Sequence, residues 1–208
     1  MERILLASGS PRRRELLEAA GIPFEVLVPD VDETLRDALP PAGRVLALAE
    51  DKARAVAALA APSAPRLILA ADTLVCLPAE GGQAGAAETA LGKPQDAADA
   101  RSMLRLLSGR RHFVRTGLAL LDRETGLLRI ARSDTSVRFA PLSGDEVEGY
   151  IASGEWEGVA GGYRIQALAF FFVEAVEGSW TGVVGLPMRE LYVILGEADF
   201  RIPALQVG

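Results

Sequence analysis

The sequence contains very few cysteine, histidine and aromatic residues. Of its 208 residues, one is cysteine, one is histidine, and 6% are Phe, Trp or Tyr. A single cysteine, Cys76, excludes an internal disulfide and a cysteine-based metal site, and a single histidine, His112, excludes a metal site that needs two. Because Cys76 lies in an apolar run, we expect a buried and inert thiol. Because arginines flank His112 at the start of a predicted strand, we expect a structural role for its ring.

The chain also lacks a positive net charge and a long apolar run. Its formal net charge is −6, which disfavours non-specific binding to nucleic acids and membrane surfaces. The longest apolar run, near residues 167–173, is too short to span a bilayer, and the first residues lack a signal-peptide pattern. We therefore expect a cytoplasmic protein with no nucleic-acid and no membrane partner, in which a local basic cluster must hold any polyanion.

Three common chemical motifs are missing as well. The sequence has no Gly-x-Ser-x-Gly elbow, no Gly-Lys-Ser/Thr phosphate loop and no Gly-x-Gly-x-x-Gly fingerprint. Serine-hydrolase chemistry therefore has little support, and any phosphate binding must use another scaffold.

Apolar periodicity predicts alternating strands and helices, which is typical of an α/β protein with a mixed sheet. The length fits one large domain or two small lobes. Residues 78–92, rich in Ala and Gly, are interpreted as a mobile loop or lid. Strands are expected at 4–7, 24–28, 67–77, 113–121, 127–139 and 170–176, and helices at 11–20, 45–59, 96–107, 143–152 and 188–195.

The segment after the first predicted strand places three arginines, residues 12–14, at the start of a helix. Ser10 is a good N-cap and Pro11 suits the first helical position. The helix dipole disfavours cations there unless an anion lies among them. Backbone N–H groups, the hydroxyls of Ser8 and Ser10, and the guanidinium groups together favour a phosphate cradle. The alternative, in which the arginines extend into solvent, is less favoured in this strand–turn–helix context.

Asp72 is the one charged residue in the apolar run 67–77. A carboxylate that is buried alone is very costly, so it needs a cation, a metal ion or hydrogen bonds. We interpret Asp72 as a metal ligand or a general base at a cleft. In the alternative interpretation, the strand ends at Ala71 and Asp72 only turns the chain.

Other charged residues are weaker candidates. Asp30, Asp32 and Glu33 offer oxygen ligands that suit Mg²⁺ or Mn²⁺, especially when substrate phosphates complete the shell. Taken alone, this motif is better explained as a solvated acidic loop. Lys52 and Lys93 are candidate phosphate partners, and the second lies in a Gly-Lys-Pro turn that could aim its ammonium inward.

A glycine pair at residues 161–162 precedes Gln166. Paired glycines permit close backbone approach or positive φ. The glutamine amide offers a donor and an acceptor, which suits recognition of the edge of a nucleobase. The alternative is a glycine turn followed by an exposed glutamine.

The order of these motifs resembles the Maf family of nucleoside triphosphate pyrophosphatases. The resemblance extends from Leu5 to about Leu195, and it depends on the ordered set because each motif is weak alone. The matching segments are LASGSPRR at 6–13, DE at 32–33, KA at 52–53, ADT at 71–73, GKP at 92–94, LSG at 107–109, TG at 116–117, SGE at 153–155, AGGYRIQ at 160–166 and VGLP at 184–187.

The resemblance implies an α/β fold in which residues 1–208 form a single domain of two lobes, with an elongated mixed sheet and a central nucleotide-binding cleft, as in ITPase-like proteins. It implies hydrolysis of a nucleoside triphosphate to the monophosphate and pyrophosphate with a divalent metal cation, Mg²⁺ or Mn²⁺. The residues that it marks are, for catalysis, Asp72, Glu33, Lys52 and Lys93; for substrate binding, Ser8, Ser10, Arg12, Arg13, Thr73 and Gln166; and for metal binding, Glu33 and Asp72.

The family branch that prefers dTTP and UTP is marked by an Arg, a Thr and a Gln, which match Arg12, Thr73 and Gln166 here. The chain departs from the family pattern at two positions, Val159 in place of a lysine and Ala167 in place of a glycine. These two departures support one alternative, a nucleotide-binding regulator with weak activity. A pyrophosphatase for a modified nucleotide is the other alternative.

The run Phe170-Phe171-Phe172 is bulkier than the family pattern leads us to expect. If its side chains are exposed, they could support a homodimer, although packing in the core explains the run equally well.

Overall fold

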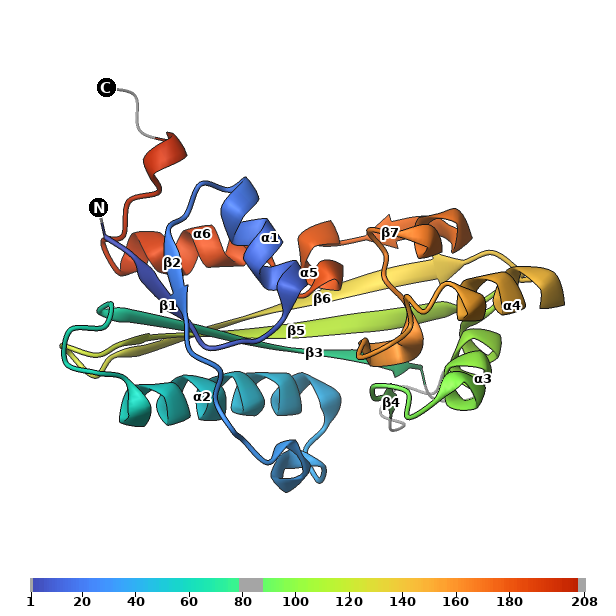
Figure 1. The fold of residues 1–208 in the computed structure, drawn as a ribbon, viewed down its shortest axis with the longest axis horizontal. Helices are drawn as coiled ribbons and strands as arrows, with labels where there is room; N and C mark the ends of the chain where they lie inside the picture. Colours follow the sequence, from blue (N-terminus) through green and yellow to red (C-terminus); the bar gives the residue numbers. More distant parts are fainter. Residues whose placement is uncertain (1, 79–87, 206–208) are drawn as a thin grey trace. The chain divides into compact units, whose positions relative to one another are not determined.

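The computed structural model describes residues 2–78 and 88–205 of the chain (Figure 1). Most of the loop or lid predicted at 78–92 lies outside the described residues. The described end of that segment contains a short strand, which was not expected.

Within the described ranges, seven strands form one mixed sheet in the order β2-β1-β3-β5-β6-β7, with β4 paired to β3. β1 is parallel to β2 and to β3, whereas β4 is antiparallel to β3 and β7 is antiparallel to β6. The α/β class and the mixed sheet are confirmed. The strands are β1 (Ile4–Leu6), β2 (Phe24–Val26), β3 (Leu67–Leu77), β4 (Thr89–Leu91), β5 (Arg111–Asp122), β6 (Leu128–Phe139) and β7 (Val173–Glu177).

Helices connect most of these strands, and side chains cap the start of two of the α-helices, by Asp96 and by Ser143. Ser143 and Glu146 form the predicted capping box, in which each side chain accepts a hydrogen bond from the backbone N–H of the other residue. The α-helices are α1 (Pro11–Ala19), α2 (Pro41–Leu59), α3 (Ala97–Leu107), α4 (Gly144–Ala152), α5 (Trp180–Val184) and α6 (Met188–Glu197), and the 3₁₀ helices are η1 (Glu33–Arg36), η3 (Ala160–Gly162), η4 (Leu168–Phe172) and η5 (Pro203–Leu205).

The strand predicted at 170–176 is wrong in its first half, because η4 occupies residues 168–172 and β7 begins at Val173. Phe172 is buried, but Phe170 and Phe171 are exposed, so this apolar run does not have the uniform burial of a central strand. Periodicity alone cannot distinguish a short apolar strand from a buried helical turn. The homodimer suggested by this run stays a prediction.

The chain divides into two compact units. Unit 1 comprises residues 1–72, 116–133 and 185–208, and unit 2 comprises residues 73–115 and 134–184. Strands β3, β5 and β6 each contribute residues to both units.

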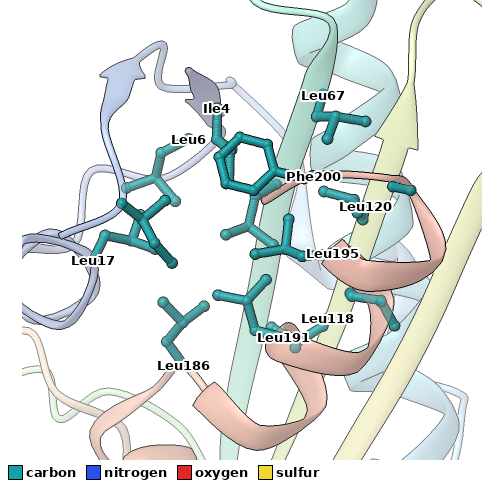
Figure 2. Close-up of a cluster of buried hydrophobic side chains, with 14 of the residues drawn as sticks. Ile4, Leu6, Leu17, Leu67, Leu118, Leu120, Leu186, Leu191, Leu195 and Phe200 are labelled. Carbon is teal, nitrogen blue, oxygen red and sulfur yellow. The ribbon is translucent and has the colours of Figure 1, made fainter. Parts of the chain in front are cut away.

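The core of unit 1 has two parts because the side chains of its strands alternate between the two faces of the sheet. Helices α1 and α6 cover one face, as the leucine-rich cluster in Figure 2 shows, and α2 covers the other (Figure 1). Alternate residues of β3 divide accordingly: Leu67, Leu69 and Ala71 pack under α1 and α6, and Ile68 and Ala70 pack under α2. The next residue in this alternation, Asp72, is on the α2 face.

An aromatic core fills part of unit 2, and it includes the single histidine. His112 is buried, its Nε2 lies 2.8 Å from the Tyr163 hydroxyl, and its ring meets Phe139 edge to face. Burial lowers the pKa of His112 to about 4, so the ring is neutral at pH 7. The predicted structural role of His112 agrees with this packing.

Candidate active site

Asp72 is held inside unit 1 by a cation from the neighbouring helix. Strand β3 continues to Leu77, so the interpretation in which the strand ends at Ala71 is wrong. Asp72 is buried on the α2 face, and its Oδ1 accepts a 2.6 Å hydrogen bond from Lys52 Nζ. Ala49 and Ala53 allow α2 to pack closely on the sheet, and this close packing brings Lys52 to the carboxylate.

Lys52 joins two carboxylates. Its Nζ lies 2.6 Å from Asp72 Oδ1 and 2.6 Å from Glu33 Oε1, and its side chain is only 12% exposed. Glu33 is the first residue of η1, and the preceding Asp32 caps this short helix by accepting hydrogen bonds from the backbone N–H and hydroxyl of Thr34. Of the three acids predicted in this loop, Asp30 is exposed and Asp32 is engaged in the cap, so Glu33 is the one that reaches Lys52.

Arg13 is fixed at the start of α1 by two hydrogen bonds. Its Nη1 donates to Ser8 Oγ at 2.9 Å, and its Nε donates to the Gly185 carbonyl at 2.8 Å. Ser10 occupies the predicted N-cap position, but its side chain makes no capping hydrogen bond. The buried Ser8 hydroxyl instead accepts a 3.3 Å hydrogen bond from the Ser10 N–H. The SGSP turn therefore orients the Arg13 guanidinium through Ser8.

The arginines and the acids of unit 1 share one electrostatic environment. Burial lowers the pKa of Arg13, the negative charges of Asp72 and Glu33 oppose that effect, and the positive charge of Arg12 adds to it. The predicted cradle residues and the predicted carboxylates are therefore close enough to interact. The group contains three cations, two carboxylates and a hydroxyl, and an anion that entered it would compete with the carboxylates for the cations.

Glu33 and Asp72 offer two carboxylates, which are ligands of the kind that a divalent cation prefers. Glu33 and Asp72 aim one oxygen each at the same point, the Lys52 ammonium. In residues 2–78 and 88–205, no cluster of three or more His, Cys, Asp or Glu side chains has the arrangement of a metal site. Mg²⁺ is commonly held by one or two carboxylates together with phosphate oxygens and water. The donor set in unit 1 suits that mode and does not form a complete protein cage.

The remaining predicted residues belong to unit 2. Lys93 is exposed after β4, and Thr73 is half-buried in β3. Gln166 is half-buried, and its Oε1 is enclosed without a hydrogen-bond partner among the described residues. A buried acceptor without a partner is unusual in a native protein and is consistent with a ligand donor.

The first glycine of the pair at residues 161–162, in unit 2, is required because a side chain would not fit there. Gly161 has φ 68°, and a Cβ there would lie within 2.8–3.0 Å of the Val75 side chain. Its backbone N–H donates to the Gly92 carbonyl at 2.9 Å, so the Gly-Lys-Pro turn and the glycine pair are joined directly. Val159, which stands where the family pattern has a lysine, is buried at the N-cap position of η3.

Gly117 and Gly185 both lie in motif segments that match the family, but sequence reasoning gave neither of them a role in the site. The Gly185 carbonyl orients Arg13. Gly117 of β5 lies under α2, where a Cβ would overlap with the Val45 carbonyl oxygen. Neither glycine has a side chain that could reveal its role. Figure 1 labels α2, the helix that carries Lys52.

Across the described ranges, no helix has both the length and the apolar character needed to cross a membrane.

The sequence profile described as Maf-like protein matches residues 3–198. The dTTP/UTP pyrophosphatase of Treponema denticola is 41% identical over 97% of this chain and 100% of its own length, and that of Chromobacterium violaceum is 45% identical over 97% of both chains. Among solved structures, the Staphylococcus aureus Ham1 protein is 17% identical, covers 67% of this chain and 72% of its own, and has a TM-score of 0.42. The similarity to the Ham1 protein, in sequence and in structure, is too low to support an argument. The family profile and the two curated relatives each extend over nearly the whole sequence, and the chain belongs to the Maf family.

Proposed function

We propose that this chain hydrolyses nucleoside triphosphates, preferentially dTTP and UTP, to the nucleoside monophosphate and pyrophosphate with the help of a divalent cation. The observation that carries the proposal is the position of Lys52, which lies between Glu33 and Asp72. The comparisons support the proposal, because two relatives that align with nearly the whole chain are named dTTP/UTP pyrophosphatase.

The cations of unit 1 are suited to a triphosphate. Hydrolysis of a phosphoanhydride needs charge neutralisation and an aligned water more than it needs covalent chemistry. A guanidinium can bind phosphate oxygens in a bidentate way, and Arg13 is already oriented by Ser8 and Gly185. Arg12 and Lys52 supply two further positive charges, and Lys93 of unit 2 is proposed as an additional phosphate partner.

The carboxylates are proposed to handle the proton and the metal. Water attacks the α-phosphorus, the bond from that phosphorus to the bridging oxygen breaks, and pyrophosphate leaves. Asp72 accepts the proton of the attacking water, because its oxygen becomes available when the Lys52 ammonium moves its hydrogen bond to a phosphate oxygen. A divalent cation held by Glu33 and Asp72 would add positive charge beside the phosphates.

Gln166 and Thr73 are proposed to recognise the base. The enclosed Oε1 of Gln166 has no partner among the described residues, and it can accept a hydrogen bond from the N3–H of uracil or thymine. The amide nitrogen of the same side chain can donate to a neighbouring carbonyl of the base. Cytosine has an acceptor at N3, so it would leave the glutamine oxygen unpaired, at a discrimination of about 10-fold or more.

A nucleotide panel tests this proposal. Pyrophosphate release is measured from dTTP, UTP, CTP, GTP and 7-methyl-GTP, with Mg²⁺, with Mn²⁺ and with a chelator. We expect the highest kcat/KM for dTTP and UTP, and no turnover with the chelator. Metal-dependent turnover of 7-methyl-GTP alone would assign the chain to a modified nucleotide. Saturable binding of a nucleotide without pyrophosphate release would contradict the enzymatic proposal and favour the regulator, for which Val159 and Ala167 are the motivation.

A further inference from the structure

The short helix η1, which carries Glu33, is not held in place by a buried apolar side chain of its own. None of the four residues of η1 is buried, and Leu35 is 76% exposed. Glu33 itself is 42% exposed, in contrast to the enclosed Lys52 and Asp72. Apolar packing therefore does not explain why Glu33 stays at hydrogen-bond distance from Lys52.

Ion pairs attach this segment to α2. Arg36 Nε donates to Asp51 Oδ2 at 2.7 Å, and Arg36 Nη2 donates to Asp51 Oδ1 at 2.8 Å. A second ion pair joins Asp37, directly after η1, to Arg44 of α2. The bidentate pair fixes both distance and orientation, because the planar guanidinium and the carboxylate match in only one arrangement.

The Arg36–Asp51 ion pair lies beside the ion pair between Glu33 and Lys52. In a 3₁₀ helix, residues i and i+3 lie on the same side, so Glu33 and Arg36 both face α2. Their partners, Lys52 and Asp51, are consecutive residues of that helix. The hydrogen bonds from Arg36 lower the pKa of Asp51, so the carboxylate remains charged at neutral pH.

We propose that Arg36 and Asp51 are positioning residues. They hold Glu33 at hydrogen-bond distance from Lys52 and so align Glu33 for the reaction. The consequence for turnover rests on the proposed function, whereas the docking of η1 onto α2 does not. Because the attachment is ionic and partly exposed, salt weakens it.

The first test measures kinetics with dTTP. We expect Arg36→Ala and Asp51→Ala each to lower kcat by about 3- to 10-fold, and KM to change by less than about twofold. Arg36→Lys restores part of the loss, because it keeps the charge but not the bidentate geometry. In a Glu33→Gln background, Arg36→Ala causes no further loss of kcat. The matched control is Arg54→Ala, which breaks the exposed pair with Glu50 on the same helix and leaves kcat unchanged.

The second test does not depend on turnover. A nitroxide attached to Leu35→Cys reports the mobility of η1, and the buried Cys76 does not compete for the label. We expect Arg36→Ala and added salt to increase the label mobility, and Arg54→Ala to leave it unchanged.

The two tests separate the inference from the proposed function. Unchanged label mobility in Arg36→Ala would overturn the inference whether or not the protein turns over dTTP. Increased mobility with unchanged kcat in an active enzyme would overturn the positioning role. Wild-type protein that releases no pyrophosphate from any nucleotide would overturn the proposed function, and increased label mobility in the same protein would still support the docking of η1 by Arg36.

Discussion

Replacing Lys52 with methionine removes the cation between two acids and keeps a side chain of similar length. The Asp72 side chain is 9% exposed, so the variant leaves this carboxylate inside unit 1 without its hydrogen-bonded ion-pair partner. Breaking a buried ion pair by removing one partner destabilises proteins by about 3–5 kcal/mol. Glu33 is much more exposed and can turn to water, so it adds little to this loss. We expect the free energy of unfolding at pH 7 to fall by about 3 kcal/mol.

A double variant separates the loss of charge balance from the loss of packing. Lys52→Met combined with Asp72→Asn removes both charges of the buried ion pair, so most of the stability should return. Asp72→Asn alone should cost less than Lys52→Met, because the lysine keeps Glu33 as a partner. Lys52→Arg keeps the charge and is the control for side-chain shape.

Denaturant unfolding of the four variants and the wild type measures these differences. The comparison requires that the slope of the free energy of unfolding against denaturant concentration is the same in all five proteins. A Lys52→Met protein within about 0.5 kcal/mol of the wild type would refute the reasoning, because that is the range of ordinary surface substitutions. A double variant less stable than either single variant would also refute it.

Three further predictions concern other buried positions of the fold. Gly117→Ala should destabilise the folded protein by about 1–3 kcal/mol and lower kcat/KM, because the added Cβ would meet the Val45 carbonyl of the helix that carries Lys52. Unfolding and activity assays measure the two effects. The control is Gly43→Ala in the same helix, where no atom lies within 4 Å of the added Cβ. Because the pKa of His112 is lowered to about 4, the folded protein binds fewer protons than the unfolded chain between about pH 4 and 6.5, and stability falls as pH falls through that window. His112→Gln should therefore reduce the slope of unfolding free energy against pH there by about 1.4 kcal/mol per pH unit, and an unchanged slope in acid-range unfolding curves would contradict the assignment. Burial raises the pKa of the Cys76 thiol to about 12, so a thiol reagent should react in denaturant and not with the native protein; rapid reaction of the native protein would be inconsistent with this burial.

Local patterns in the sequence predicted the elements that hold the site, because strong periodicity and capping chemistry act within a few residues. The apolar run 67–77 is one strand, and Ser10 and Pro11 stand at the N-cap and first position of α1 as expected. Strand alternation also places Asp72 on the same face as Ile68 and Ala70. These features needed no knowledge of which elements are neighbours.

The contacts within the site could not be predicted in the same way. The approach of Lys52 to Asp72 depends on the packing of α2 against β3, twenty residues away in sequence, and the family resemblance alone brought the two together as site residues. The link between Arg13 and Gly185 joins positions 172 residues apart through a backbone oxygen, and side-chain type carries no signal for such a contact. The Arg36–Asp51 pair was missed because each residue taken alone resembles an ordinary exposed charge.

Two lobes were expected, but the positions at which the two units divide could not be found in the sequence. Domain boundaries usually fall in exposed linkers rich in Pro, Gly or polar residues. Here three of the divisions fall inside strands β3, β5 and β6, where the residues are selected for burial and pairing. Composition therefore does not change at those points.

Hydrolysis of dTTP in ¹⁸O-labelled water by the wild type and by Asp72→Asn tests the central claim most directly. The account predicts pyrophosphate as a product, the label in the monophosphate, and a loss of turnover of about 10²-fold or more in a folded Asp72→Asn protein. Release of orthophosphate with the label, or normal turnover by Asp72→Asn, would contradict it.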